Sequence, residues 1–199
     1  MRDQSNDISV SPGSSKLTTG LSPRPVKQVG LLAVISAVIY AIAFATPLSA
    51  QGSWKSKAPL PTARYALAAV EGPGGLIYTM GGTTCFYCPT NTVEVYSPST
   101  NTWTTGAPLP TPRYALAAAS LAGLIYAIGG YNVGYGGPLA TVEAFSQSTN
   151  TWSTKASMTT VRLGLAVVVA NGRIYAIGGD AGGGGAPLSS AEMYDPATN

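Results

Sequence analysis

The chain has no histidine, few charged residues and only two cysteines, and each shortage excludes a class of function. Without histidine it lacks the usual zinc ligand, the base of a Ser-His-Asp triad and the commonest general acid or base. Charged residues make up 10% of the 199 residues, and the basic ones are scattered, unlike the clustered Lys and Arg of nucleic-acid-binding proteins. We therefore expect no catalytic residues, no metal, no cofactor and no nucleic-acid partner.

What is present is typical of a turn-rich β protein. The 24 glycines and 15 prolines are about a fifth of the chain, far too few and without the period of a collagen. A hydrophobic content of 45% is too high for wholesale disorder. The length suits one medium domain, or one domain with a tail.

The first fifty residues differ from the rest, and we expect them to lie outside the folded domain. Residues 1–28 are rich in Ser, Pro and Thr, which predicts a disordered tail. Residues 29–45 form an uncharged apolar run, roughly 26 Å long as a helix. Basic residues before the run and small residues in the linker or cleavage region 46–51 predict a signal anchor or signal-peptide core.

Both interpretations of residues 29–45 place the later part of the chain outside the cytoplasm, either secreted or membrane-anchored. A buried core helix is the alternative. The flanking residues and the position of the run, ahead of the repeats described next, disfavour it.

Residues 52–199 contain a repeat of 49 residues. Tryptophan, arginine, glutamate and a glycine pair each recur in three copies, with one step of 48 between the first two glycine pairs. The recurring residues are Trp54, Trp103 and Trp152; Arg64, Arg113 and Arg162; Glu94, Glu143 and Glu192; and Gly81-Gly82, Gly129-Gly130 and Gly178-Gly179. A period near fifty residues is typical of solenoids and propellers.

Each copy contains four short apolar or alternating runs separated by turn residues. In the first copy these runs are 65–70, 76–80, 92–96 and 101–105, and none has the period of a helix. We therefore predict an all-β fold in which each copy is a four-stranded antiparallel blade.

The order of an arginine-led apolar strand, I-Y-x-x-G-G, V-E-x-[YF] and T-N-T-W resembles the kelch repeat of β-propellers. The resemblance covers 52–199, with repeats at about 52–102, 103–151 and 152–199. It implies that the arginine-led strand is innermost in each blade and the tryptophan strand outermost. The alanines of the first strand agree, because strands crowded around an axis need small side chains.

Three blades are fewer than the four to eight that usually close a propeller. The third copy lacks its outer strand, and an extra one precedes the first copy at Ser53-Trp54-Lys55. Two explanations stay open. Either the chain is a fragment of a longer six-bladed protein, or two chains form a homodimer in which each N-terminal strand completes a blade of its partner.

The repeated arginine and glutamate are 30 residues apart in every copy. A ring of arginines could bind an anionic ligand. We favour a structural Arg–Glu pair that ties strands together, because equal numbers in fixed register suit such a device and an unpaired buried charge is costly.

Two loops carry residues that invite a chemical interpretation. Cys85 and Cys88 predict a local disulfide outside the cytoplasm, or inert thiols, whereas zinc binding would need a second pair or a histidine. The run from Gly182 to Gly185 lacks the Gly-Lys-[Ser/Thr] of a phosphate loop, and it indicates a flexible loop.

In kelch proteins the loops around the inner strands often line the ligand face. The resemblance points to Tyr131, Asn132 and Tyr135 in one such loop, and to Tyr65 and Tyr114, which directly follow two of the arginines. Exposed aromatic side chains suit contact with peptide or sugar. Packing against a neighbouring blade is the alternative.

Together these features predict an extracytoplasmic binding or scaffold module for an unidentified protein or glycan ligand, membrane-bound through 29–45 if this segment is not cleaved. The alternative is part of a carbohydrate-active or oxidative propeller enzyme whose catalytic residues lie outside this chain. Some kelch propellers are enzymes, among them galactose oxidase and sialic-acid mutarotases. The copper site of the oxidase uses histidines, which this chain lacks.

Overall fold

The computed structural model of the protein describes residues 52–182 and 186–198. The chain divides into two units, Met1–Trp54 and Lys55–Asn199. Only 52–54 are described in the first unit, and they form no strand. The predicted tail, signal segment and linker lie outside the described residues. No helix within the described ranges has the length and apolarity that crossing a bilayer requires.

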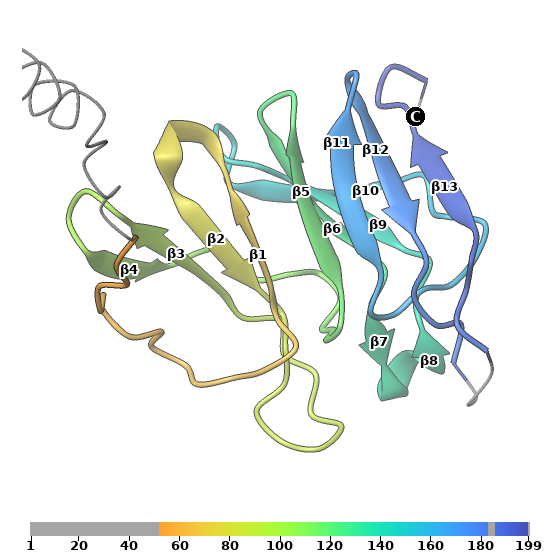
Figure 1. Ribbon diagram of the computed structural model, residues 1–199, viewed down its shortest axis with the longest axis horizontal. Coiled ribbons are helices and arrows are strands. Elements are labelled where there is room, and N and C mark those ends of the chain that lie inside the picture. The colour runs from red at the N-terminus through yellow and green to blue at the C-terminus, as the bar shows by residue number, and fades with distance from the viewer. Residues whose placement is uncertain (1–51, 183–185, 199) are drawn as a thin grey trace, which may run out of the picture. The chain divides into compact units, whose positions relative to one another are not determined.

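The second unit is built from antiparallel sheets, and the prediction of an all-β fold is confirmed (Figure 1). Three of the sheets are blades, and the rest of the described structure is a small hairpin with two short 3-10 turns. Blade 1 contains β1 (Ala68–Glu71), β2 (Ile77–Met80), β3 (Val93–Ser97) and β4 (Thr102–Thr105); blade 2 contains β5 (Ala117–Leu121), β6 (Leu124–Ile128), β9 (Val142–Ser146) and β10 (Thr151–Lys155); blade 3 contains β11 (Ala166–Ala170), β12 (Arg173–Ile177) and β13 (Ala191–Tyr194); the hairpin is β7 (Tyr131–Asn132) with β8 (Gly137–Pro138), and the turns are η1 (Pro73–Gly75) and η2 (Val133–Tyr135).

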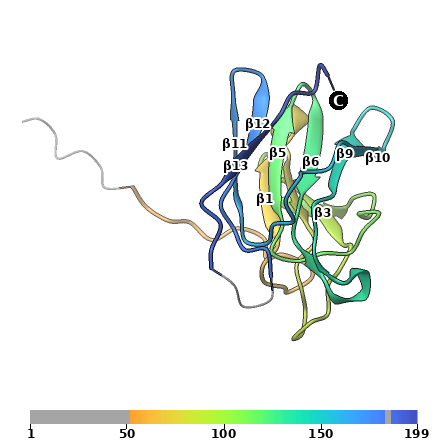
Figure 2. The same cartoon turned by 90° about the vertical axis from the view of Figure 1, so that its right-hand side faces the viewer.

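The strand order places the arginine-led strand at one edge of each blade and the tryptophan strand at the other edge of blades 1 and 2. The strands β1, β5 and β11 are neighbours, as Figures 1 and 2 show, and they are the inner strands. Within the described residues, blade 3 ends at β13 and has no fourth strand.

The first strand of blade 1 begins later than the sequence predicted. It starts at Ala68 because Ala66 has a left-handed backbone, with φ of 53°, which interrupts the extended chain. Tyr65 instead pairs with Thr83 in an isolated bridge. The predicted outer strand at Ser53-Trp54-Lys55 is wrong for the single chain, in which Trp54 is fully exposed and no strand pairs with it.

Apolar side chains fill the space between successive blades. Between blades 1 and 2, Tyr78 and Met80 of β2 belong to the same buried cluster as Ile125 and Phe145 of blade 2. A second buried cluster joins blades 2 and 3 and contains Ile128 and Ile174, among others. Each blade is therefore stabilised mainly by its neighbours, as expected for a repeat protein.

The repeated glycine pairs allow this close approach of the blades. A Cβ on Gly81 would lie 2.4 Å from the carbonyl oxygen of Arg113, and a Cβ on Gly129 would lie 2.5 Å from that of Arg162. Gly82 and Gly130, the second glycines of these two pairs, donate their N–H groups to the same carbonyls at 2.9 and 2.8 Å. Both members have positive φ, so glycine is required for the turn and for the contact.

Candidate functional site

Aromatic side chains from blades 1 and 2 gather where the loops around the inner strands meet. We call this group the aromatic surface; it consists of Tyr65, Phe86, Tyr87, Tyr114 and Tyr131. The rings of Tyr114 and Tyr131 have centroids 5.3 Å apart, those of Tyr87 and Tyr131 are 6.4 Å apart, and those of Phe86 and Tyr87 are 4.5 Å apart. Residues from different blades thus form one patch.

Backbone pairing positions these tyrosines. Tyr114 forms an isolated bridge with Tyr131, and Tyr65 forms one with Thr83 at the start of the next loop. Each of Tyr65 and Tyr114 directly follows a repeated arginine whose side chain has no exposed surface. A buried arginine therefore precedes each of these two tyrosines and anchors its backbone.

A disulfide shapes the loop that carries the remaining two rings. Cys85 and Cys88 are bonded and enclose Phe86 and Tyr87. The hydroxyl of Thr83 donates to the carbonyl of Cys85 or Cys88, and the latter oxygen is 2.9 Å away. Closing this short loop turns both rings to the surface, where they are 80% and 54% exposed.

The aromatic surface contains no Asp, Glu, Lys or Arg side chain. The pKa of Tyr114 is raised, first by burial and then by the nearby phenols of Tyr131, Tyr87 and Tyr65. The surface therefore offers ring faces and hydroxyl groups to a ligand.

Two of the residues predicted for the ligand face are not among the rings of this patch. Asn132 is buried, and its amide group donates to the carbonyl of Pro112 and accepts from the N–H of Gly134 at 2.7 Å, so it has a structural role in the loop. Tyr135, in η2, is 65% exposed. No ring contact joins it to the patch within the described residues.

Sequence reasoning missed Phe86 and Tyr87, because it treated their loop only as a disulfide. The available signal was a pair of aromatic residues in the loop that matches Tyr131 one repeat later. Blade 3 does not extend the patch: its equivalent bridge joins Leu163 to Asp180.

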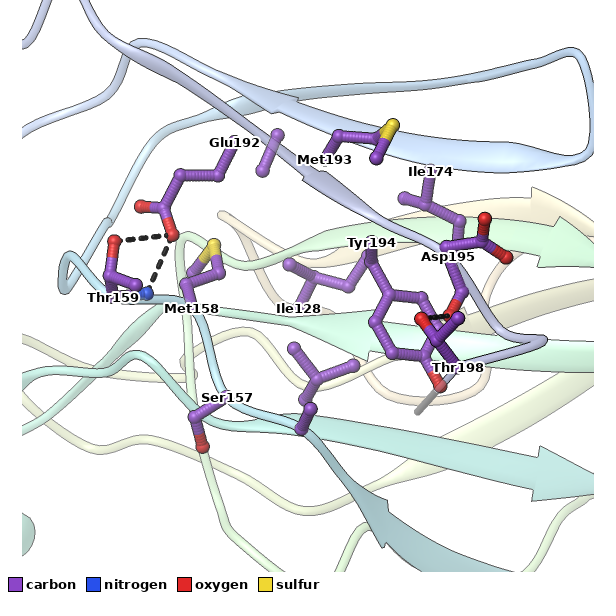
Figure 3. Close-up of a pocket in the computed structure, with 13 residues that line it drawn as sticks. Ile128, Ser157, Met158, Thr159, Ile174, Glu192, Met193, Tyr194, Asp195 and Thr198 are labelled. Atoms are coloured by element: carbon purple, nitrogen blue, oxygen red, sulfur yellow. Dashed lines mark hydrogen bonds between the residues drawn. The ribbon is translucent and has the colours of Figure 1, made fainter.

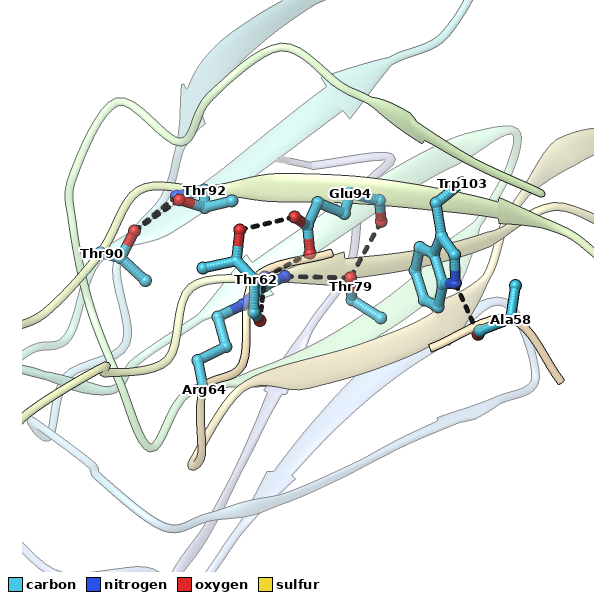
Figure 4. Close-up of polar contacts among 8 residues, drawn as sticks. All are labelled: Ala58, Thr62, Arg64, Thr79, Thr90, Thr92, Glu94 and Trp103. Carbon is cyan, nitrogen blue, oxygen red and sulfur yellow. Dashed lines mark hydrogen bonds and ion pairs between the residues drawn. The ribbon is translucent and has the colours of Figure 1, made fainter. Parts of the chain in front are cut away.

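The repeated arginines and glutamates form buried ion pairs within each blade. In blade 1, Arg64 contacts Glu94 and donates to the hydroxyl of Thr79 at 3.0 Å, while Thr62 donates to Glu94 at 2.8 Å (Figure 4). The pair ties the segment before β1 to β2 and β3.

Blades 2 and 3 repeat the same device. Arg113 lies 3.0 Å from Glu143, and Arg162 lies 3.1 Å from Glu192. All three arginine side chains are 0% exposed, so none is available to a ligand at the surface. A ring of anion-binding arginines is therefore excluded for the described structure.

Hydrogen bonds hold the pKa of Glu192 at about 2. Burial acts in the opposite direction and is the largest single cause. The hydrogen bonds from Thr159, Arg162 and Thr160 to the carboxylate outweigh it. Burial lowers the pKa of Arg113, and Glu143 partly restores it.

The repeated tryptophans hold the outer strands to the segment that enters each blade. The indole N–H of Trp103 donates to the carbonyl of Ala58 at 2.9 Å (Figure 4). That of Trp152 donates to the carbonyl of Ala107 at 3.0 Å. The ring of Trp152 also packs against that of Phe145 in a tilted arrangement, at 5.3 Å between centroids.

A cavity of about 250 Å³ lies away from the aromatic surface, beside the outer edge of blade 3 (Figure 3). Its walls include Met158, Glu192 and Tyr194. In the part of the chain that the structure describes, no group of three or more His, Cys, Asp or Glu side chains could hold a metal ion.

Comparison with known proteins agrees with this architecture. The kelch motif matches residues 64–110, 112–159 and 162–199, which together are more than half of the chain. A kelch repeat implies a protein-binding or scaffold module. The comparison with curated proteins found no match.

Among solved structures, that of YjhT matches with a TM-score of 0.63 at 20% identity, over 72% of this chain and 53% of that chain. The likeness is one of fold, and this chain spans about half the length of that structure. With three motif matches, three blades in sequence order and the propeller fold of the solved structure, the chain belongs to the kelch-motif family.

Proposed function

We propose that the repeats act as an extracytoplasmic binding module whose aromatic surface contacts an uncharged segment of a protein or a glycan. The observation that carries the proposal is the gathering of Tyr65, Tyr87, Tyr114 and Tyr131 from two blades into one partly exposed patch. Aromatic residues with a hydroxyl group are enriched at binding surfaces because they offer a large apolar contact and a hydrogen bond together.

The lack of Asp, Glu, Lys and Arg in the patch argues for an uncharged ligand. Binding sites for phosphate or carboxylate groups rely on exposed Arg or Lys, and the repeated arginines are buried. Flat rings suit the apolar faces of sugars and of proline-rich peptides, and phenol groups can bond to hydroxyl or amide groups.

The proposal of an extracytoplasmic location is supported by the apolar run 29–45 and by the Cys85–Cys88 disulfide. Disulfides persist in oxidising compartments and are rare in the cytosol. Treating intact cells with a membrane-impermeant protease tests this location. Digestion of the repeats supports it, and complete protection overturns it.

Binding can be tested on arrays of neutral glycans and uncharged peptides with the full chain. We expect binding to one class of probe, and Tyr87→Ala or Tyr65→Ala should weaken it at least about 30-fold, the loss typical of a central contact residue. Tyr135→Ala is the matched control, because this tyrosine is exposed but has no ring contact with the patch within the described residues. An equal loss in all three variants would contradict the assignment of the surface.

The same arrays separate binding from catalysis. An enzyme would convert a bound glycan, and mass spectrometry of the recovered probe would show new products. Binding without conversion supports a module without chemistry of its own. Conversion that survives Tyr87→Ala would place an active site elsewhere and overturn the proposal.

A further inference from the structure

One face of blade 3 is exposed, although the equivalent face of blade 2 is buried. The open face of blade 3 consists of Val168, Ile177 and Met193, which are 49%, 44% and 53% exposed. The residues 49 positions earlier, Ala119, Ile128 and Ala144, pack against blade 3 and are only 5%, 3% and 1% exposed. The face of blade 3 thus has the composition of a blade-to-blade contact without a neighbour among the described residues.

Backbone groups repeat this pattern. The N–H of Ala115 donates to the carbonyl of Ala66, and the N–H of Gly164 donates to that of Ala115, both at 2.8 Å. Neighbouring blades are therefore joined through one residue that occupies equivalent positions in all three repeats. At the two ends of this series, the N–H of Ala66 and the carbonyl of Gly164 have no backbone partner in the described residues.

A second backbone contact ends in the same way. Gly82 donates to the carbonyl of Arg113, and Gly130 donates to that of Arg162. The equivalent donor in blade 3 is Gly179, and the equivalent acceptor on blade 1 is the carbonyl of Arg64. Within the described part of the chain, neither group has such a partner. In both of these contacts, the donor left over on one outer blade has its equivalent acceptor on the other outer blade.

The cavity at the edge of blade 3 lies at the position that corresponds to the repeated tryptophan of blade 2. In blade 2, Trp152 packs against Phe145 and donates to Ala107. The equivalent residues in blade 3 are Tyr194 and Ala156, and both line the cavity (Figure 3). The third repeated tryptophan is Trp54, which precedes blade 1 and is fully exposed.

Trp54 cannot reach this cavity in its own chain. The segment is fixed at Ala58, which donates to Asn101 at 2.9 Å and accepts from Trp103 on the outer strand of blade 1. Four residues span at most about 14 Å. Blade 2 lies between blades 1 and 3, and packed sheets are about 10 Å apart, so the path is at least about 20 Å.

We propose that a second copy of this chain supplies the missing contacts. Two chains pair head to tail, so that blade 1 of each covers the open face of blade 3 of the other. The segment 53–57 of each chain adds to β13 of its partner, and Trp54 enters the cavity. Three blades from each chain then close a six-bladed ring with two-fold symmetry.

Charge and register support this occupant. In blade 2, Ser153 of the outer strand pairs with Ala144. The equivalent of Ser153 in the added strand is Lys55, and the equivalent of Ala144 in blade 3 is Met193. The same register therefore places Lys55 opposite Met193. By the same register Ser56 lies opposite Glu192, and Lys55 lies diagonally across from Asp195 on one face of the sheet. Long side chains can reach a diagonal neighbour, and opposite charges in such positions favour the association of two strands.

The mass of the full chain in solution is the first test. The protein is purified in detergent, because of its apolar run, and examined by light scattering with correction for the micelle. We expect the mass of two chains. A single-chain mass at micromolar concentration would overturn the proposal, and would leave a further blade of another protein or chain segment as the occupant of the open face.

Two variants and a control connect the mass to this interface. Gly178→Ala places a Cβ where Gly81 and Gly129 meet the neighbouring arginine carbonyl, yet within the chain its nearest atom is 3.3 Å away. Met193→Arg puts a charge on the open face. Both should give monomers with unchanged circular dichroism. Gly123→Ala, with similar positive φ and open surroundings, should stay dimeric. Dimers in both test variants would refute the interface.

Cross-linking tests the strand register directly. Chains carrying Lys55→Cys are mixed with chains carrying Met193→Cys, and the mixture is oxidised mildly. Opposed residues in antiparallel strands have Cα atoms about 4.5–5.5 Å apart, within the range of a disulfide. We expect a cross-linked pair from this mixture, and far less from Ser53→Cys with Met193→Cys. Equal yields, or none from the first mixture, would refute the strand exchange.

Discussion

Replacing Arg113 by Met tests whether the buried ion pairs hold the blades in shape. The Arg113 side chain is fully buried and donates hydrogen bonds to three backbone carbonyl groups. Its Nη2 forms an ion pair with Oε2 of Glu143 at 3.0 Å, and no hydrogen bond from another group reaches either atom. The substitution therefore leaves the Glu143 carboxylate buried without its counter-charge.

The expected loss follows from this environment. Removing one partner of a buried ion pair costs about 3–5 kcal/mol of unfolding free energy, because the remaining charge is not compensated. At about 2–4 °C per kcal/mol for a domain of this size, the melting temperature should fall by about 6–20 °C. Replacing both residues, as Arg113→Met with Glu143→Leu, should restore most of the loss, since apolar pairs of similar volume are tolerated in such positions.

Urea unfolding followed by tryptophan fluorescence measures these differences. Arg173→Met is the matched control, because Arg173 also pairs with a carboxylate, at 2.9 Å from Asp195, but its side chain is 42% exposed. An exposed pair contributes at most about 1 kcal/mol. The reasoning fails if Arg113→Met costs no more than the control, or if the double variant is as unstable as the sum of its single changes.

Three further predictions concern blade 3, the glycine pairs and the disulfide. The pKa of Glu192 is about 2 in the folded chain against 4.5 ordinarily, so its stabilising effect is present above about pH 4.5 and is lost as the pH falls toward 2. Glu192→Gln should flatten a plot of melting temperature against pH in this range, and an unchanged slope would contradict the assignment. Gly129→Ala should lower the melting temperature more than Gly123→Ala, because only the first Cβ meets a carbonyl of the next blade, whereas equal losses would argue against that contact. Cys85→Ser should weaken binding to an array ligand with little change in melting temperature, because the bond closes only a short loop; a large drop in melting temperature would show a wider structural role.

The fold was predictable because its residues recur. Each blade needs an arginine to pair with its glutamate, a glycine pair to let the next blade approach and a tryptophan to hold its outer strand. The same physical requirement applies in every repeat, so the same residue types appear at a spacing of 49. The ion pairs Arg64–Glu94, Arg113–Glu143 and Arg162–Glu192 and their burial follow from that spacing.

Strand limits were less predictable, because they depend on backbone conformation. An alanine in the left-handed region is unfavourable, and the apolar run 65–70 gives no sign that Ala66 adopts it. The conformation is stabilised by a neighbour, since the carbonyl of Ala66 accepts the N–H of Ala115 from the next blade. A local pattern cannot reveal a turn that a distant residue stabilises.

The candidate site was the least predictable part because it departs from the repeat. Tyr87 lies in a loop whose sequence differs from copy to copy, between the bonded Cys85 and Cys88, and its ring contacts that of Tyr131. Tyr65 and Tyr114 occur in two copies, and the third has Leu163. Residues that serve the scaffold must recur, whereas a ligand contacts one place on the ring. Exposed residues that break the period are therefore the ones to examine first for binding, and in this chain Tyr65, Phe86 and Tyr87 belong to one patch.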